Sequence, residues 1–289
     1  MAAPPARLDR LSALLEGLAP TVLLDPGTAD ADGAAAAPTP EDLRLYLLTR
    51  DGMRLRLAGR TLPVHAPAMV VMRASAPHRL EGKRLGGQGH LIRARVRLAG
   101  PVADLFLEEF AEPRVLSLAN DEPALRLAVT LIETELGAPR CGQPALLHRA
   151  GDILFIGLLR HLVAHPGPGA TGLFSGLADP RIARALVAMH QRPQADWSLE
   201  RLAGEAGMSR TAFASTFREV MRRTPGRYLS AIRLALARRA VDSGKGLKEA
   251  ARVAGYGNVS ALSRALSRAR AGSDNADPVP DGLSAVQAV

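Results

Sequence analysis

The chain contains 289 residues, of which 47% are hydrophobic, and it carries a formal net charge of +9. This length suits two domains, and the hydrophobic content excludes a globally disordered chain. No apolar run reaches the roughly 18 residues that a membrane span needs. The single cysteine, Cys141, excludes an internal disulfide and a thiolate metal cluster. Asp9 and Glu16 interrupt the apolar N-terminal stretch, which predicts a short amphipathic helix instead of a signal peptide and hence a cytoplasmic protein.

The charge is distributed unevenly along the chain. Residues 181–271 hold 18 Lys/Arg against 6 Asp/Glu, a net charge of +12, whereas residues 1–180 hold 19 of each and are neutral. The last segment, 272–289, has only three aspartates and a net charge of −3. A basic segment attracts a polyanion through phosphate contacts and counterion release. The asymmetry therefore favours nucleic-acid binding over a merely solvated surface.

The N-terminal part reads as short strands separated by Gly and Pro. Apolar residues alternate through 43–57 around Asp51-Gly52, which predicts a β-hairpin. Further strands are predicted at 69–73, 90–98 and 103–110, and together they indicate a small barrel or sandwich. Three arginines alternate with apolar residues in the 90–98 strand, and we expect them to form its solvated face, not a binding patch: Arg93, Arg95 and Arg97.

The periodicity then changes from strand to helix. Helices are predicted at 125–136 and 145–164, and the Pro/Gly-rich stretch 166–176 is typical of a linker at a domain boundary. Helical patterns resume at residue 180 and continue to about residue 271. The Asp/Pro-rich end of the chain is expected to be disordered.

The basic part contains an internal repeat, in which residues 199–217 echo residues 247–266. Each copy reads as a short helix, a turn with a glycine (Gly207 or Gly255) and a second helix. This is the helix-turn-helix pattern, whose second helix enters the major groove of DNA. The apolar positions of the second helices also correspond, and we assign them to the core: Phe213, Phe217, Leu262 and Leu266.

Local signals mark where the helices of this region begin and end. Ser209 and Asn258 are predicted to cap the second helix of each copy. Between the copies, Thr224 and Pro225 begin a helix that Gly244 ends. A helix of about 18 residues spans ~27 Å, which suits two recognition helices near one DNA turn, ~34 Å, apart.

These residues identify a family resemblance. Residues 180–270, with two helix-turn-helix units and the intervening Pro225-x-x-Tyr228-Leu229-x-x-x-Arg233 element, resemble the DNA-binding domain of AraC-type transcription regulators. The upstream part resembles the subgroup with a cupin-like barrel followed by helices. The resemblance implies an α+β chain, divided as follows: a cupin-like effector-binding barrel at 1–120, a helical dimerisation segment at 121–165, a linker at 166–179, the double helix-turn-helix domain at 180–271 and a disordered tail at 272–289.

The resemblance also implies which side chains touch DNA. In the first recognition helix these are Thr211, Ala214 and Ser215 for base edges, with Arg210 and Arg218 for phosphates. In the second they are Ser260, Ser263 and Arg264 for bases. Arg264 has the bidentate geometry that suits guanine. The implied partners are promoter DNA, a small-molecule effector, RNA polymerase and a second copy of the chain, with no cofactor and no membrane.

The sequence departs from the family pattern at its C-terminal end. Leucines stand where phenylalanines are usual, and the family's aromatic-Gly-x-Ser/Thr-Pro segment is replaced by the Asp/Pro tail. One alternative is therefore a degenerate member that no longer reads DNA specifically. Another is a cupin-type metal enzyme with a helical appendage, but no convincing ligand set is found and we predict neither a metal site nor an enzyme. The histidines weighed as ligands are His65, His78, His90, His161 and His165. A role of Cys141 as a reactive sensor thiol is a further alternative, but we interpret it as a cysteine without a functional role.

Overall fold

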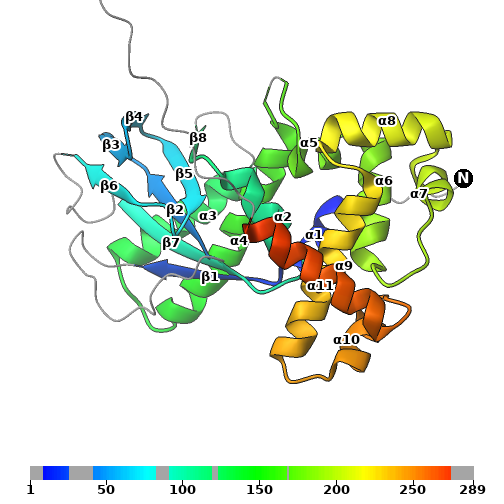
Figure 1. The fold of residues 1–289 in the computed structure, drawn as a ribbon. Helices are drawn as coiled ribbons and strands as arrows, with labels where there is room; N and C mark the ends of the chain where they lie inside the picture. Colours follow the sequence, from blue (N-terminus) through cyan, green and yellow to red (C-terminus); the bar gives the residue numbers. More distant parts are fainter. Residues whose placement is uncertain (1–8, 26–41, 83–90, 119–122, 168, 275–289) are drawn as a thin grey trace, which may run out of the picture. The chain divides into compact units, whose positions relative to one another are not determined.

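The computed structural model describes residues 9–25, 42–82, 91–118, 123–167 and 169–274 (Figure 1). The chain divides into two compact units. The first contains residues 1–193 and 197–232, and the second contains residues 194–196 and 233–289. The division falls inside one helix, so the two helix-turn-helix copies belong to different units. No described helix is long and apolar enough to cross a membrane.

The first unit begins with helix α1, Arg10–Leu18. Asp9 caps it by accepting hydrogen bonds from the backbone N–H groups of Leu11 and Ser12. The helix buries Leu14 and Leu18, so the predicted amphipathic helix is confirmed. Its first residue, Arg10, donates to the carbonyl oxygen of Leu177 at 2.8 Å, which ties the N-terminus to the helices that precede the first helix-turn-helix.

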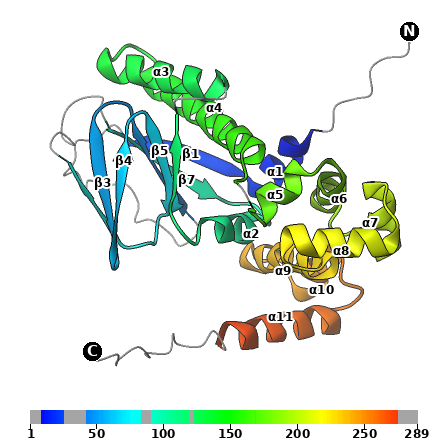
Figure 2. The ribbon, with the colours of Figure 1, turned by 90° about the horizontal axis from the view of Figure 1, so that it is seen from above.

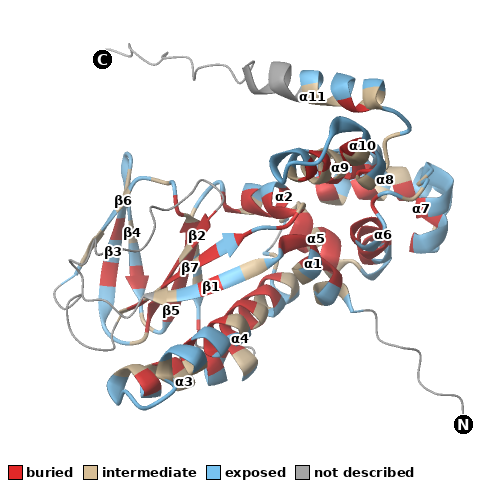
Figure 3. Cartoon of the chain, turned by 90° about the horizontal axis from the view of Figure 1, so that it is seen from below, coloured by how far each residue is buried: buried red, intermediate tan, exposed pale blue. Residues whose placement is uncertain are grey.

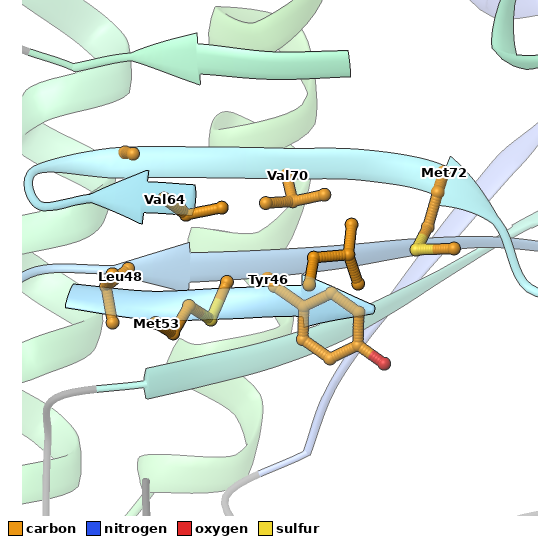
Figure 4. Close-up of a cluster of buried hydrophobic side chains, with 8 residues drawn as sticks. Tyr46, Leu48, Met53, Val64, Val70 and Met72 are labelled. Atoms are coloured by element: carbon orange, nitrogen blue, oxygen red, sulfur yellow. The ribbon is translucent and has the colours of Figure 1, made fainter. Parts of the chain in front are cut away.

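Two antiparallel sheets follow. The five-stranded sheet has the order β1 (Pro20–Asp25), β7 (Leu91–Leu98), β2 (Asp42–Leu48), β5 (Ala68–Arg73) and β8 (Arg114–Ser117). The three-stranded sheet has the order β4 (Arg60–His65), β3 (Gly52–Leu57) and β6 (His78–Glu81). Their inner faces share one apolar cluster, of which Figure 4 shows the side chains: Tyr46, Leu48, Met53, Leu55, Val64, Ala68, Val70 and Met72.

Two of the strand predictions are wrong. Residues 43–57 do not form a hairpin, because β2 pairs with β5 and β7 whereas β3 pairs with β4 and β6. The chain crosses from one sheet to the other at Asp51, which takes the left-handed conformation with φ of 63°. Residues 103–110 form helix α2 (Ala103–Leu107) and the short 3-10 helix η1 (Glu108–Phe110). Three consecutive residues, 105–107, are buried there, which no half-exposed strand would allow. The strands at 69–73 and 90–98 are confirmed as β5 and β7.

Helices α3 (Pro123–Gly137) and α4 (Gln143–Ala164) confirm the two predicted helices and lie along one side of the five-stranded sheet (Figure 2). The packing is close at two glycines of α4. A Cβ on Gly151 would lie 2.9 Å from Val22 of β1, and one on Gly157 would lie 2.9 Å from the backbone nitrogen of Leu125 in α3. Any larger residue at these positions would push α4 off the sheet or off α3.

The remaining elements are helical. The predicted linker at 166–176 contains the start of helix α5 (Leu173–Ala178), whose Phe174 packs edge-on against Phe106 and Phe110. Helices α6 (Pro180–Gln191), α7 (Leu199–Ala206) and α8 (Arg210–Met221) complete the first unit together with the start of α9 (Pro225–Asp242). The second unit holds α10 (Leu247–Val253) and α11 (Val259–Asp274). Figure 3 shows that buried residues run along one side of α4 and that α7 is largely exposed.

Candidate nucleic-acid interface

The first helix-turn-helix consists of α7, a three-residue turn and α8. Ser198 caps α7 by accepting from the N–H of Arg201 at 3.1 Å. The helix ends at Gly207, whose φ of 65° is the left-handed conformation that favours glycine. Ser209 then accepts from the N–H of Ala212 at 3.3 Å and begins α8, so both the turn glycine and the predicted cap are confirmed.

Helix α8 has one buried and one exposed side. Phe213, Phe217 and Met221 are buried, and the rings of the two phenylalanines pack with their centroids 5.5 Å apart. The opposite side consists of short or basic residues, all exposed except the half-buried Ala214: Arg210, Thr211, Ala214, Ser215 and Arg218. The helix therefore presents a surface without large apolar groups, with a shape that suits a DNA groove.

A buried polar pair holds α8 and α9 onto α6. The hydroxyl of Tyr228 lies 2.7 Å from Nε2 of His190, and the two rings stack. Tyr228 also packs edge-on against Phe217. Burial lowers the pKa of His190 to about 4 and raises the pKa of Tyr228. The sequence analysis found Tyr228 through its motif but missed His190, because a histidine inside an apolar helix gives no local signal of its partner.

The second helix-turn-helix is built from α10 and α11. Gly255 has a φ of 74°, and a Cβ there would lie 2.6 Å from the Cα of Gln194. Asn258 caps α11 by accepting from the N–H of Ala261 at 2.8 Å, as predicted. Arg233 of the Pro-x-x-Tyr-Leu element donates to the carbonyl oxygen of Ala195 at 2.7 Å. This arginine therefore has a structural contact in the second unit.

The core of the second unit is made of smaller side chains. It contains Ala237, Ala240, Ala250, Ala251, Ala254 and Leu262. Leu262 is fully buried, whereas Leu266 is half-buried against the cluster. On the other side of α11, Ser260, Ser263 and Arg264 are exposed. The predicted division into core and outward residues thus holds here too, with less buried apolar area than the phenylalanines supply in the first unit.

Several basic side chains of these helices lack an acidic partner. Among the described residues, Arg210, Arg218 and Arg264 form no ion pair, whereas Arg192 pairs with Glu205 and Arg252 pairs with Glu249. An exposed guanidinium without a carboxylate neighbour keeps its full attraction for phosphate. The charges of these three arginines are therefore available on the exposed sides of α8 and α11.

A contact within the first unit joins η1 to the turn between α8 and α9. Glu108 pairs with Arg223, and the carboxylate of Glu109 accepts from the backbone N–H of Leu173 at 2.5 Å. Burial raises the pKa of Glu109, against the opposing effects of the Leu173 hydrogen bond and of Arg114. These groups line a cavity of about 240 Å³ that Tyr228 also borders. The sequence analysis missed this contact, which joins residues more than a hundred positions apart.

Of the histidines weighed as metal ligands, the described ones do not gather into a group of three or more with other potential ligands, although His161 and His165 are neighbours on α4. His65 is exposed on β4, whereas His78 on β6 uses both ring nitrogens in hydrogen bonds, to Tyr46 and to the carbonyl oxygen of Ala76. His90 lies outside the described residues, which contain no group of three or more potential ligands placed around one point. The rings of His161 and His165 lie 4.8 Å apart on α4. Cys141 is exposed in the turn between α3 and α4.

The prediction that the arginines of β7 form a solvated face is confirmed for Arg97, which is exposed, but not for Arg93 and Arg95. In the β2–β7 register, Arg93 lies opposite Tyr46 and Arg95 lies opposite Arg44. Directly opposite residues of a sheet point to the same side, and Tyr46 points into the cluster between the two sheets. Arg93 and Arg95 are accordingly half-buried on the inner face instead of forming a solvated one. The outward face of β7 is the apolar one, which the helices cover.

Comparison with known proteins gives the family. A cupin family model matches residues 9–164, and a helix-turn-helix domain model matches residues 202–271. A putative AraC-like transcription regulator of Streptomyces lividans is 30% identical over 231 residues, which is 77% of this chain and 73% of that protein. The chain belongs to the AraC family of transcription regulators. A second AraC-like regulator, from Streptomyces antibioticus, is 30% identical over 65% of this chain and 64% of its own length.

Two further comparisons are more distant. The RCS-specific activator RclR of Escherichia coli is 26% identical over 68% of this chain and 69% of its length. A crystal structure of ToxT from Vibrio cholerae aligns with 87% of this chain and 93% of its own, with 8% sequence identity and a TM-score of 0.35. The matched models confirm the resemblance inferred from the sequence: a cupin N-terminal part and a helix-turn-helix C-terminal part in an α+β chain.

Proposed function

We propose that this AraC-family regulator binds promoter DNA through α8 and α11 and that a small effector in the cupin domain controls this binding. The observation that carries the proposal is the pair of capped helices, each with a buried apolar side and an exposed short or basic side. In DNA recognition such a second helix lies in the major groove. The two units then read successive groove segments.

We assign the contacts as follows. Thr211, Ala214 and Ser215 of α8 face base edges, and their small size favours readout of methyl groups and groove shape. Ser260, Ser263 and Arg264 of α11 face bases, with Arg264 bidentate to guanine. Arg210 and Arg218 bind phosphates. These eight residues have exposed or half-exposed side chains, which is what supports the assignment.

Dimerisation belongs to the helical segment at 121–165. Leu127 of α3 is 70% exposed and Ile153 of α4 is 42% exposed, so each helix presents a large apolar side chain to solvent. A second copy of the chain would cover them.

We propose that RNA polymerase is a further partner at the promoter. We also propose that the protein is cytoplasmic and has no enzymatic activity. The domain limits are those of the resemblance, with the functional division between sensor and DNA-binding parts at 166–179.

The effector signal passes from the cupin domain to the first helix-turn-helix. The ion pair of Glu108 with Arg223 and the hydrogen bond from Leu173 to Glu109 are short links between the two. An effector regulates DNA binding only if it has different affinities for two arrangements of these parts. A shift of η1 on effector binding changes these links first, because Glu108 and Glu109 are both in η1.

The testing experiment is a selection of genomic DNA fragments by the purified chain at near-physiological salt, followed by sequencing. We expect a motif with two half-sites about one helical turn apart. A motif covering one half-site would refute base readout by α11. A flat affinity across sequences would support the degenerate family member instead, and a stoichiometric transition metal in the purified protein would support the cupin-type enzyme.

A further inference from the structure

The cavity beside the turn between α8 and α9 has walls from several parts of the chain. It is lined by α2 and η1, by β8, by residues 171–173 before and at the start of α5, by residues 221–223 at the end of α8, and by Tyr228 of α9. All of these belong to the first unit. Its volume of about 240 Å³ is well above the ~10–15 Å³ that one water molecule needs, so a small organic molecule fits.

The two carboxylates that line this cavity already have cationic partners. Glu108 forms an ion pair with Arg223, and Oε2 of Glu109 lies 3.4 Å from Nη2 of Arg114. Glu109 also accepts a hydrogen bond from the backbone N–H of Leu173. Burial raises the pKa of Glu109, and protonation there would reduce the negative charge of the lining further. The lining carboxylates therefore leave no negative charge for a third arginine.

Arg222 is the third arginine of the lining. It is exposed, and its side chain has no hydrogen-bond or ion-pair partner among the residues that the structure describes. With three arginines against two glutamates, the lining carries a formal net charge of +1. An oxyanion bound at Arg222 would neutralise this excess, because the guanidinium is always charged and donates to such groups through several N–H bonds.

The backbone at Arg222 gives independent support for a role of its side chain. The residue takes the left-handed conformation, with φ of 55° and ψ of 16°, at the end of α8. Glycine or asparagine is the usual residue there, because this conformation is strained for a residue with a Cβ. Helix α7 ends in the same conformation but uses Gly207. A strained position that holds an unpaired charged side chain at a cavity indicates a binding function.

We propose that this cavity is a binding site for a small oxyanion, a carboxylate or a phosphate, with Arg222 as its main contact. A guanidinium offers a planar fork of donors that matches both groups bidentately. Thr171 also lines the cavity, and its hydroxyl is a second, uncharged donor. The lining shares no residue with the apolar cluster between the two sheets, so the site is separate from an effector bound there.

The position of the site predicts what its ligand does. The short helix η1 follows α2 in the cupin domain, whereas Arg222 and Tyr228 flank the turn that joins α8 to α9. An anion held at Arg222 therefore bridges the sensor part and the first helix-turn-helix, beside the ion pair of Glu108 with Arg223. It stabilises one placement of α8. The effect on DNA rests on the proposed function, whereas the site itself does not.

The test is thermal unfolding of the full chain in chloride, in inorganic phosphate and in acetate, at equal ionic strength and neutral pH. We expect phosphate or acetate to raise Tm saturably by about 2–4 °C over chloride. Arg222→Gly removes the guanidinium but suits the left-handed backbone, so we expect it to fold and to lose this rise. Arg227→Met, at an exposed position outside the lining, is the matched control and keeps the rise. The difference between the two variants measures the site, since the general stabilisation by such salts acts on both.

Two outcomes would overturn the site: an equal Tm in all three salts, or a rise that Arg222→Gly retains in full. A second measurement is affinity for the selected DNA, with and without the active anion at constant ionic strength. We expect the anion to change the affinity of the unchanged protein but not that of Arg222→Gly. If Arg222→Gly weakens DNA binding equally with and without the anion and no salt raises Tm through Arg222, the residue is a DNA phosphate contact and the site is refuted. If the anion raises Tm through Arg222 but leaves DNA affinity unchanged, the site stands and its effect on DNA binding fails.

Discussion

The buried pair of His190 and Tyr228 makes the first helix-turn-helix sensitive to acid. His190 is enclosed, and its Nδ1 has no hydrogen-bond partner among the described residues. Protonation would place an uncompensated charge in this enclosed site, and burial therefore lowers the pKa of His190 to about 4. The ordinary value, which applies to the unfolded chain, is 6.5.

The sign and size of the effect follow from these two values. Above the unfolded pKa the residue is neutral in both states and stability is unaffected. As the pH falls from there towards the folded pKa, only the unfolded chain binds the proton, so the free energy of unfolding decreases. The loss is about 1.4 kcal/mol at pH 5.5 and about 2 kcal/mol at pH 5.0, since one pKa unit corresponds to about 1.36 kcal/mol.

The assay is urea unfolding of the full chain at pH 7.5 and pH 5.5, for the unchanged protein and for His190→Gln. Glutamine retains an acceptor for the Tyr228 hydroxyl but does not titrate in this range. We expect the decrease between the two pH values to be smaller in His190→Gln by about 1.4 kcal/mol. His65→Gln, at an exposed position, is the control and keeps the full decrease. Equal decreases in all three proteins would refute the reasoning.

Three further predictions concern single positions. Arg264→Ala should weaken binding to the selected DNA site by ~1–3 kcal/mol of binding free energy and reduce the base preference at one position of that site, as measured by titration of site variants. An equal loss of affinity on every sequence would show that Arg264 contacts a phosphate instead of a base. Gly207→Ala should cost about 1–2 kcal/mol of unfolding free energy for the left-handed backbone, and Gly255→Ala more, because its Cβ also meets backbone. Glu109→Gln, which changes a buried carboxylate, should lower the free energy of unfolding by ~1–3 kcal/mol, whereas Glu108→Gln, which changes a half-exposed carboxylate, should lower it by under ~1 kcal/mol. Equal urea unfolding midpoints for the two variants would contradict this difference.

Most features of the DNA-binding part could be predicted from the sequence. The caps at Ser209 and Asn258, the turn glycines and the burial of Phe213 and Phe217 all appear as expected. These features depend on residues three or four positions apart, because a helix makes its backbone hydrogen bonds and its buried stripe locally. The internal repeat also supported the helix-turn-helix prediction, since the same pattern of turn glycine and apolar positions occurs in both copies.

The contacts of the recognition helices with α6 could not be predicted in the same way. Tyr228 was marked by its motif, but its partner His190 lies 38 positions away and resembles any other helical histidine. The links of Glu108 and Glu109 cross a still longer distance in sequence. Such contacts depend on how whole elements pack, and no local pattern encodes that packing.

In the cupin domain, the sequence predicted some of the strands but not which of their faces point inward. Alternation in β2 and β7 correctly established that Arg93, Arg95 and Arg97 share one face of a strand. It did not establish which face meets the core, because helices cover one side of the five-stranded sheet and the second sheet covers the other. Both faces of a central strand are then enclosed, and apolar residues no longer identify the inward one.

Residue order along the chain was therefore sufficient for the family, for the two helix-turn-helix units and for the outward positions of α8 and α11. Strand pairing was decided only in three dimensions: β2 joins β5 and β7, not the adjacent β3. Pairing depends on hydrogen bonds between segments distant in sequence, whose register no single segment contains. That register brings Arg44 opposite Arg95 and places both arginines on the same side of the sheet as Tyr46.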